Sequence, residues 1–171
     1  MALDFPASPS NGQKYPASPI VGVPTYTWDG EKWTAVGGLG LTAATAAEYM
    51  ANSAPGKMLT SGATWGAAPP LNLGFGTTFT FDFSAAGDFI IVMNGATSLP
   101  NPTARKLGQK GLIYVCQDTS GGRLITSWGS VWKFPGSTKP VLSTAASSVD
   151  VISYAVADAN QVFCTFAKAF G

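Results

Sequence analysis

Apolar and polar positions alternate in short runs over the C-terminal half of the chain, as they do in strands. In residues 76–84, GTTFTFDFS, three Phe fall on one side and Thr, Thr and Asp on the other, which predicts a half-buried strand. The mainly apolar run DFIIVMNG at 88–95 follows after Ala85-Ala86-Gly87, a spacer that predicts a hairpin turn between the two strands.

Residues 109–134 lie at the centre of this pattern. Residues 112–115 are an unbroken apolar run, Gly121-Gly122 is a reversal signal, and apolar positions resume after it. Two short apolar runs around Gly-Gly predict an antiparallel hairpin over residues 110–127, followed by a further strand segment at 128–134.

The last strands of the pattern are residues 149–157 and 161–167, which are predicted to pair across residues 158–160. Together the runs predict roughly seven or eight short strands joined by short loops. The fold class that this pattern indicates is mainly β, with an antiparallel β-sandwich of the jelly-roll-like kind over residues 75–171.

The N-terminal part of the chain is predicted to be extended. Residues 5–9 and 15–22 both contain an aromatic residue followed by Pro-Ala-Ser-Pro, and proline disfavours ladder pairing. Asp29-Gly30 is a strong hairpin signal between short aromatic strands. A lone hairpin is marginal in water, so its aromatic residues are expected to pack on the main domain or on another protein.

Residues 41–53 are the one convincing helix candidate, with Thr42 as a possible cap and Pro55-Gly56 after the end. Residues 54–74 are rich in Gly, Pro and Ala and are interpreted as a linker, in which Trp65 is expected to pin the loop to a surface. The predicted organisation is an attachment segment at 1–38, a short helix and linker at 39–74, and the β domain at 75–171.

The composition changes the picture of the surface. Hydrophobic residues make up 46% of the chain and charged residues 11%, against roughly 25% charged in a typical globular domain. Such a surface must be covered by small and polar residues or be buried against other chains, which predicts an oligomer. The net charge of +1 provides no electrostatic footprint for nucleic acid.

Targeting signals are not visible in the sequence. Residues 1–10, MALDFPASPS, lack the basic and apolar regions of a signal peptide, and no run approaches the roughly 20 apolar residues of a membrane span. We expect that the chain is made in a cytoplasm and that it has no membrane-spanning segment.

Candidate chemistry is sparse. The chain has no His, no phosphate-binding loop and no dinucleotide fingerprint, so no cofactor and no metal is expected. Cys116 and Cys164 each lie in an apolar run and are predicted to be buried free thiols, although a disulfide stays open if their strands are neighbours.

A carboxylate-only mechanism would need two facing acids. The candidates lie at predicted strand ends or turns, where local hydrogen bonding is the favoured role of Asp, so we expect no enzyme. These candidates are Asp82, Asp88, Asp118, Asp150 and Asp158.

Two Trp pairs have alternative interpretations. Trp28 with Trp33, and Trp128 with Trp132, would suit either sugar-stacking platforms or packing. For Trp128 and Trp132 we favour core or inter-subunit packing. Trp28 and Trp33 flank the Asp-Gly turn and suit a partner interface equally well.

Two stretches resemble virion proteins of tailed bacteriophages. Residues 5–38, FPASPSNGQKY…YTWDGEKWTAVGG, are similar to a recurrent segment of tail-fibre and tail-associated proteins. Residues 78–170, with the succession QD…GGR…WG…WKFPG at 117–136, resemble a tail-fibre or fibre-like domain. The chain departs from long fibres because it is short and lacks a repeat shaft.

The resemblance implies a structural component of the virion, a short tail, neck or head fibre or decoration protein. It further implies a homotrimer whose partners are other virion proteins, with a host surface glycan as a further candidate. Within the attachment segment the expected anchors are aromatic: Phe5, Tyr15, Tyr26, Trp28 and Trp33. The alternatives are a polysaccharide depolymerase and a Trp-based carbohydrate-binding module.

Overall fold

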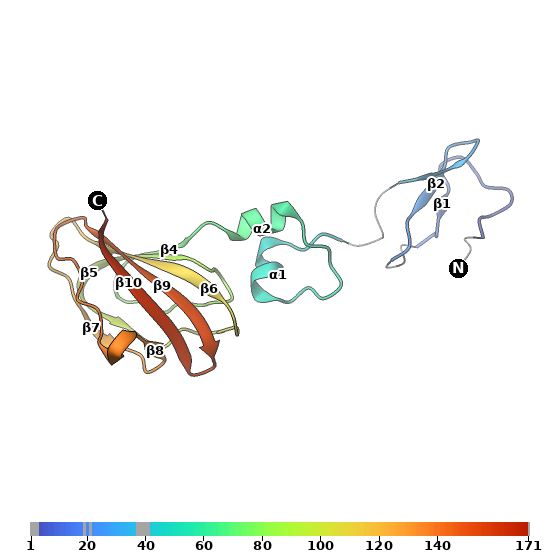
Figure 1. The fold of residues 1–171 in the computed structure, drawn as a ribbon. Coiled ribbons are helices and arrows are strands. Elements are labelled where there is room, and N and C mark those ends of the chain that lie inside the picture. Colours follow the sequence, from blue (N-terminus) through green and yellow to red (C-terminus); the bar gives the residue numbers. More distant parts are fainter. Residues whose placement is uncertain (1–3, 19, 21, 37–41, 171) are drawn as a thin grey trace. The chain divides into compact units, whose positions relative to one another are not determined.

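The computed structural model describes residues 4–18, 20, 22–36 and 42–170 (Figure 1). The chain divides into two compact units, Met1–Ala44 with Ala54–Thr60, and Thr45–Ser53 with Ser61–Gly171. We call them the N-terminal unit and the β unit. The helical segments belong to the β unit, so the predicted boundary at residue 74 is not a boundary between units.

The N-terminal unit is built on a small antiparallel sheet of β1 (Lys14–Tyr15), β2 (Tyr26–Trp28) and β3 (Trp33–Ala35). Asp29 closes the turn between β2 and β3, because its Oδ1 accepts the N–H groups of Glu31 and Lys32, both at 2.9 Å. The predicted Asp-Gly hairpin is therefore confirmed. The proline-flanked stretch was expected to be poor at ladder pairing, yet Lys14 and Tyr15 pair with β2.

Two short helices precede the main sheet, where the sequence predicted one. Helix α1 (Ala46–Ala51) has Thr45 as its N-cap where Thr42 was predicted, because Thr45 and Glu48 form a reciprocal capping box. Helix α2 (Ser61–Ala67) occupies part of the predicted linker. Its Ser, Gly and Thr residues are weak helix formers, which is why the sequence pattern missed it. Trp65 is 76% exposed, so the prediction that it pins the loop is wrong.

The β unit contains one large sheet with the strand order β4-β5-β6-β9-β10-β8, and β7 pairs with β5 beside this path. The strands are β4 (Leu71–Thr78), β5 (Phe89–Leu99), β6 (Lys110–Gln117), β7 (Ile125–Trp128), β8 (Trp132–Lys133), β9 (Val149–Asp158) and β10 (Gln161–Phe170). A single 3₁₀ turn, η1 (Pro135–Ser137), follows β8.

The mainly β fold class is confirmed. The large sheet is mixed where an antiparallel one was expected, and the jelly-roll-like sandwich is not confirmed. Strand β5 runs parallel to β4, β6 and β7, and β8 runs parallel to β10. The predicted hairpins at residues 85–87 and 121–122 are therefore wrong. The hairpin of β9 and β10 is confirmed, with Gln161 paired to Asp158.

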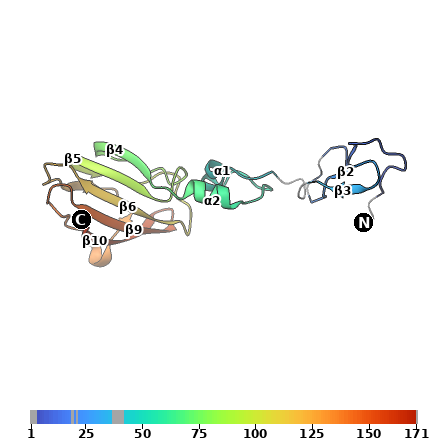
Figure 2. The same ribbon diagram turned by 90° about the horizontal axis from the view of Figure 1, so that it is seen from above.

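The sheet curls around its core (Figure 2). Strands β7 and β8 lie next to β5 and β10, and only residues 129–131 separate β7 from β8 along the chain. The inner side is filled from the strands and from irregular segments. Phe79, Phe81 and Phe83 are buried as their alternation predicted, although β4 ends at Thr78.

Among the residues with described positions, no helix has the length and apolar character needed to cross a membrane.

Candidate functional site

The five predicted anchor residues of the N-terminal unit lie together in one aromatic cluster. The ring centroid of Phe5 is 5.1 Å from that of Tyr15, and 5.0 Å from those of Tyr26 and Trp33. The rings of Trp28 and Trp33 are 5.6 Å apart on adjacent strands. Strand alternation explains the arrangement, because Tyr26 and Trp28 lie two residues apart on one face of β2.

All five side chains of this aromatic cluster are half-buried. Phe5 stacks on Trp33 with an interplanar angle of 20° and meets Tyr26 edge-on at 86°. Such ring pairs contribute about 0.5–1.5 kcal/mol each beyond area burial. The rings thus stabilise the unit through one another and present only part of their surface to a partner.

The other face of the small sheet carries a shallow groove of about 600 Å³. Its lining is mainly Thr and small apolar side chains with one cation: Lys14, Pro16, Ala17, Thr25, Thr27 and Val36. Val36 is 45% exposed and Ile20, elsewhere in the same unit, is 52% exposed. These two residues are the large exposed aliphatic side chains of the described part of residues 4–36.

Neither Trp pair forms a flat platform for sugar stacking. The rings of Trp28 and Trp33 are tilted by 59°, and those of Trp128 and Trp132 by 77°. Trp132 is buried in the core, where its indole N–H donates to the carbonyl of Pro100 at 3.0 Å. Trp128 is half-buried and meets Phe134 edge-on at 4.9 Å.

Lys139 supports this second Trp pair, and the sequence pattern did not single it out. Its Nζ donates to the carbonyl of Trp132 at 2.8 Å and lies 5.8 Å from the ring centroid of Trp128 and 5.3 Å from that of Phe134. A cation over an aromatic face is attracted by the ring quadrupole. No local signal marks Lys139, because it lies in an irregular loop whose position depends on the core.

The QD…GGR part of the succession at residues 117–136 forms a loop after β6 that hydrogen bonds hold in place. The Asp118 carboxylate accepts from Arg123 Nη2 at 2.7 Å and Nε at 3.0 Å, and from the N–H of Gly121 at 2.9 Å. These donors, the Arg123 guanidinium first, lower the pKa of Asp118 below its ordinary value. Gln117 is buried, and its amide bonds the backbone of Arg123 and Ser143.

Glycines in the same motifs allow close backbone approach. A Cβ on Gly121 would lie 2.5 Å from the carbonyl oxygen of Thr144, and one on Gly129 would lie 2.2 Å from Oδ1 of Asn101. Asn101 Oδ1 also accepts the N–H of Val131 at 3.1 Å. The motif residues at 117–136 therefore hold loops against the sheet, which is a structural role.

The other candidate carboxylates also accept hydrogen bonds from backbone N–H groups. The pairs are Asp82 with Ser84 (2.9 Å), Asp88 with Leu112 (2.8 Å), Asp150 with Ser143 (2.7 Å) and Ala169 (2.9 Å), and Asp158 with Asn160 (2.6 Å). The hydroxyl and N–H of Ser84 lower the pKa of Asp82. No group of three or more potential metal ligands occurs among the residues that the structure places.

The two cysteines are free thiols, as predicted, although the burial predicted for both holds only for Cys164. Cys164 on β10 is buried, and desolvation raises its pKa to about 12. Cys116 on β6 is half-buried on the opposite side of the sheet, and burial raises its pKa as well.

Comparisons of the chain with models of protein families, with curated proteins and with solved structures found no match. The functional interpretation accordingly starts from the geometry of the two units and from the motifs in the sequence.

Proposed function

We propose that the chain is a structural protein of the virion of a tailed bacteriophage, a short tail, neck or head fibre or decoration component. Its N-terminal unit attaches to the particle, and its β unit is presented outward as part of a homotrimer. The observation that carries this proposal is the division of the chain into two compact units that hold separate aromatic cores. One unit can then be held by the particle without disturbing the other.

The contacts around the recognised motifs support a structural role. Asp118, Gly121, Gln117 and Trp132 bond or pack within the β unit, as a framework protein requires. The motifs that prompted the likeness to virion proteins therefore stabilise the fold. A persistent external domain depends on this kind of internal bonding.

The N-terminal unit suits attachment because its surface is specific in shape. The aromatic cluster holds the backbone of the small sheet in place. The opposite face of this sheet carries a groove lined by Lys14 and the exposed Val36. Truncation of a buried aromatic anchor at an interface weakens the binding free energy by roughly 2 kcal/mol or more. Since the five rings share contacts, removing one also weakens the surface that the others support.

The test is incorporation into particles. We expect a chain lacking residues 1–38 to keep a folded β unit and to be absent from purified virions, as measured by quantitative mass spectrometry of particles. Trp28→Ala combined with Trp33→Ala should lower incorporation in the same direction. Trp65→Ala is the matched control, because Trp65 is 76% exposed and belongs to the other unit.

Two results would count against the proposal in different ways. Normal incorporation of the shortened chain would move the attachment surface to the β unit. Absence of the full chain from purified particles would overturn the virion role itself.

A further inference from the structure

The large sheet is apolar on its outer side as well as on its inner side. On β6 the inward residues Ile113 and Val115 are buried in the core, while Leu112, Tyr114 and Cys116 alternate with them and face outward. A sheet with one face in water normally alternates apolar with polar residues. On β6 the outward positions are apolar as well, so they belong to a second apolar surface.

We call this surface the outer face. It is spread over four neighbouring strands, and its positions are Ile90, Val92, Leu112, Tyr114, Cys116, Val149, Val151, Ser153, Thr165 and Ala167. None of these positions holds Lys, Arg, Asp or Glu. Monomeric proteins rarely expose contiguous apolar patches larger than a few hundred Å², and larger ones mark interaction sites.

Register places the outer face in continuous rows across the sheet. Val92 pairs with Cys116, Cys116 with Val149, and Val149 with Phe170. On the other side Val92 pairs with Phe75 of the edge strand β4. This row therefore ends in two exposed aromatic rings, since Phe75 is 72% and Phe170 is 51% exposed.

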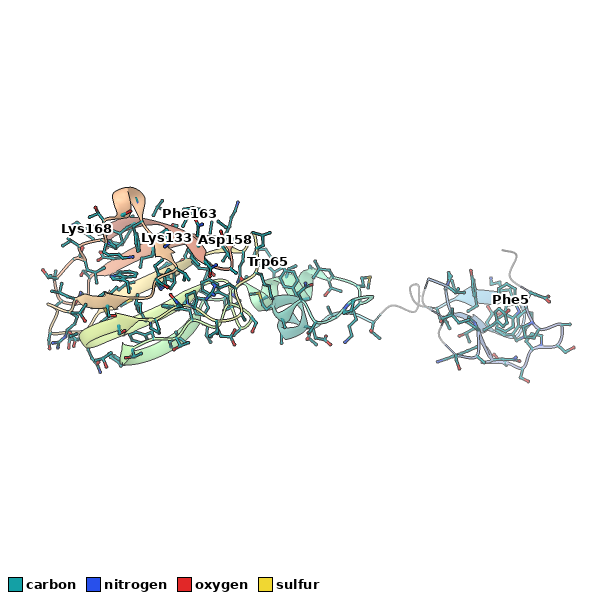
Figure 3. The ribbon with its side chains drawn as sticks, turned by 90° about the horizontal axis from the view of Figure 1, so that it is seen from below. Phe5, Trp65, Lys133, Asp158, Phe163 and Lys168 are labelled. Carbon is teal, nitrogen blue, oxygen red and sulfur yellow. The ribbon has the colours of Figure 1, made fainter. Side chains whose placement is uncertain are left out.

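Charged residues lie at the border of the rows, where Asp88 accepts the N–H of Leu112 and Lys168 follows Ala167 on β10. Lys110 pairs with Ala155, which pairs with Phe163, and Phe163 pairs with Lys133 of β8. Figure 3 shows Phe163 and Lys133 close together on this part of the β unit. The arrangement of an apolar centre and a polar border is that of a protein interface.

The area of the outer face is sufficient for specific association. Counted with its border residues and with Phe75 and Phe170 at the row ends, the outer face has about sixteen outward positions. Strands lie about 4.8 Å apart and rise about 3.3 Å per residue, so each outward position covers about 32 Å² and the whole surface roughly 500 Å². Two such faces remove about 1,000 Å² from water when they meet, which reaches the lower limit for a specific interface.

We infer that the outer face is the surface through which copies of this chain associate, an inference that rests on the self-association in the proposed function but not on the virion role. A second copy of this chain is the partner that fits, because two outer faces without charged residues at their centres can pack together without electrostatic repulsion. In copies related by an axis along the strands, the β4 side of one face lies beside the β10 side of the next. Phe75 of one copy then meets Phe170 of its neighbour.

The test compares a charge placed on the outer face with the same charge placed elsewhere. Val151→Lys buries an unpaired ammonium group in the interface and should weaken association at least about 30-fold. Val141→Lys is the matched control, because Val141 is 74% exposed and lies outside the outer face. Mass is measured by sedimentation of the full chain at micromolar concentration, and folding by circular dichroism.

A second variant protects the test against failure to fold. Thr165→Lys changes an exposed position of the outer face and should have the same effect. Cys116 provides an independent readout, because maleimide labelling followed by peptide mass spectrometry should be slow in the associated chain and fast after dilution or in Thr165→Lys.

Three outcomes would overturn the inference. The wild-type chain could sediment as a single chain with Cys116 accessible, or as a single chain with Cys116 protected, which would mean that another part of the chain covers the face. The folded lysine variants could also sediment like wild type, which would place association elsewhere. Loss of the virion role alone would leave the sedimentation results unchanged, so the two failures are distinguishable.

Discussion

At the scale of single residues, most carboxylates that were candidates for catalysis accept hydrogen bonds that hold turns and loops in place. Asp118 and Arg123 form a bidentate pair at 2.7 and 3.0 Å, and the same carboxylate holds the turn through Gly121. Asp150 is buried and accepts the backbone N–H groups of Ser143, in the preceding loop, and of Ala169 on β10. Their positions at strand ends follow from the need to satisfy backbone donors where ladders stop.

Asp118 makes stability depend on pH in a defined direction. Its pKa in the folded chain lies below the ordinary value of 3.8, so the unfolded chain binds the proton first as pH falls. The stabilisation is therefore complete well above pH 3.8 and is lost as pH falls through the folded pKa. Asp118→Asn should lower the melting temperature at neutral pH, and its difference from wild type should shrink towards pH 2.

Thermal unfolding of both proteins between pH 2 and 7 measures this effect. Arg123→Gln should reproduce the pH dependence, because it removes the main donor to the same carboxylate. A difference between wild type and Asp118→Asn that stays constant over this range would contradict the assignment.

At the scale of elements, the close approach of β6 to the loop before β5 depends on Gly111. A Cβ at this position would lie 2.0 Å from the carbonyl oxygen of Gly87 and 2.8 Å from the hydroxyl of Tyr154. That hydroxyl donates to the same Gly87 carbonyl at 2.5 Å. The contact therefore joins three segments of the β unit through atoms that cannot be moved independently.

Gly111→Ala should lower the free energy of unfolding by about 2 kcal/mol or more, because overpacking must displace backbone. Gly87→Ala is the matched control, since its Cβ would lie 3.8 Å from the carbonyl oxygen of Lys110, an ordinary contact distance, and its effect should stay within about 1 kcal/mol. Urea denaturation of the two variants measures the difference. Equal stability would show that the loop yields easily and that the contact is not restrictive.

At the scale of the whole molecule, the division into two units predicts that each responds separately to substitution. Trp33→Ala removes a ring that contacts Phe5, Tyr15 and Trp28. Truncating a fully buried Trp costs about 3–5 kcal/mol, and the half-buried Trp33 should cost part of that. A small sheet depends on its hydrophobic face for stability, so this loss is large for the N-terminal unit. The N-terminal unit should unfold while the β unit stays folded.

Amide resonances in a ¹H–¹⁵N correlation spectrum distinguish the two units. Signals from residues 14–36 should collapse in Trp33→Ala, and those from strands β5, β6, β9 and β10 should keep their positions. Trp65→Ala serves as the control with an exposed ring. Loss of signals from both units would mean that they fold as one cooperative body.

The sequence by itself determined the burial of one alternating aromatic run and the position of two tight turns. The Phe79, Phe81 and Phe83 alternation, the Asp29 turn and the hairpin between β9 and β10 all follow from neighbours in the chain. Such features depend on side-chain period and on residues that favour a reversal, and both are local properties.

Only the tertiary structure decided the strand partners, the second helix and the meeting of the five aromatic rings. Alternation with a period of two places a residue on one face of a sheet, but it does not determine which strand lies beside it. The pairing of β7 with β5, where the sequence predicted a pairing with β6, therefore depends on the tertiary structure. Phe5 meets Trp33 across 27 intervening positions because burial of both rings stabilises that approach. The outer face likewise emerges only when register sets Phe75, Val92, Cys116 and Phe170 in one row, since they come from strands far apart in sequence.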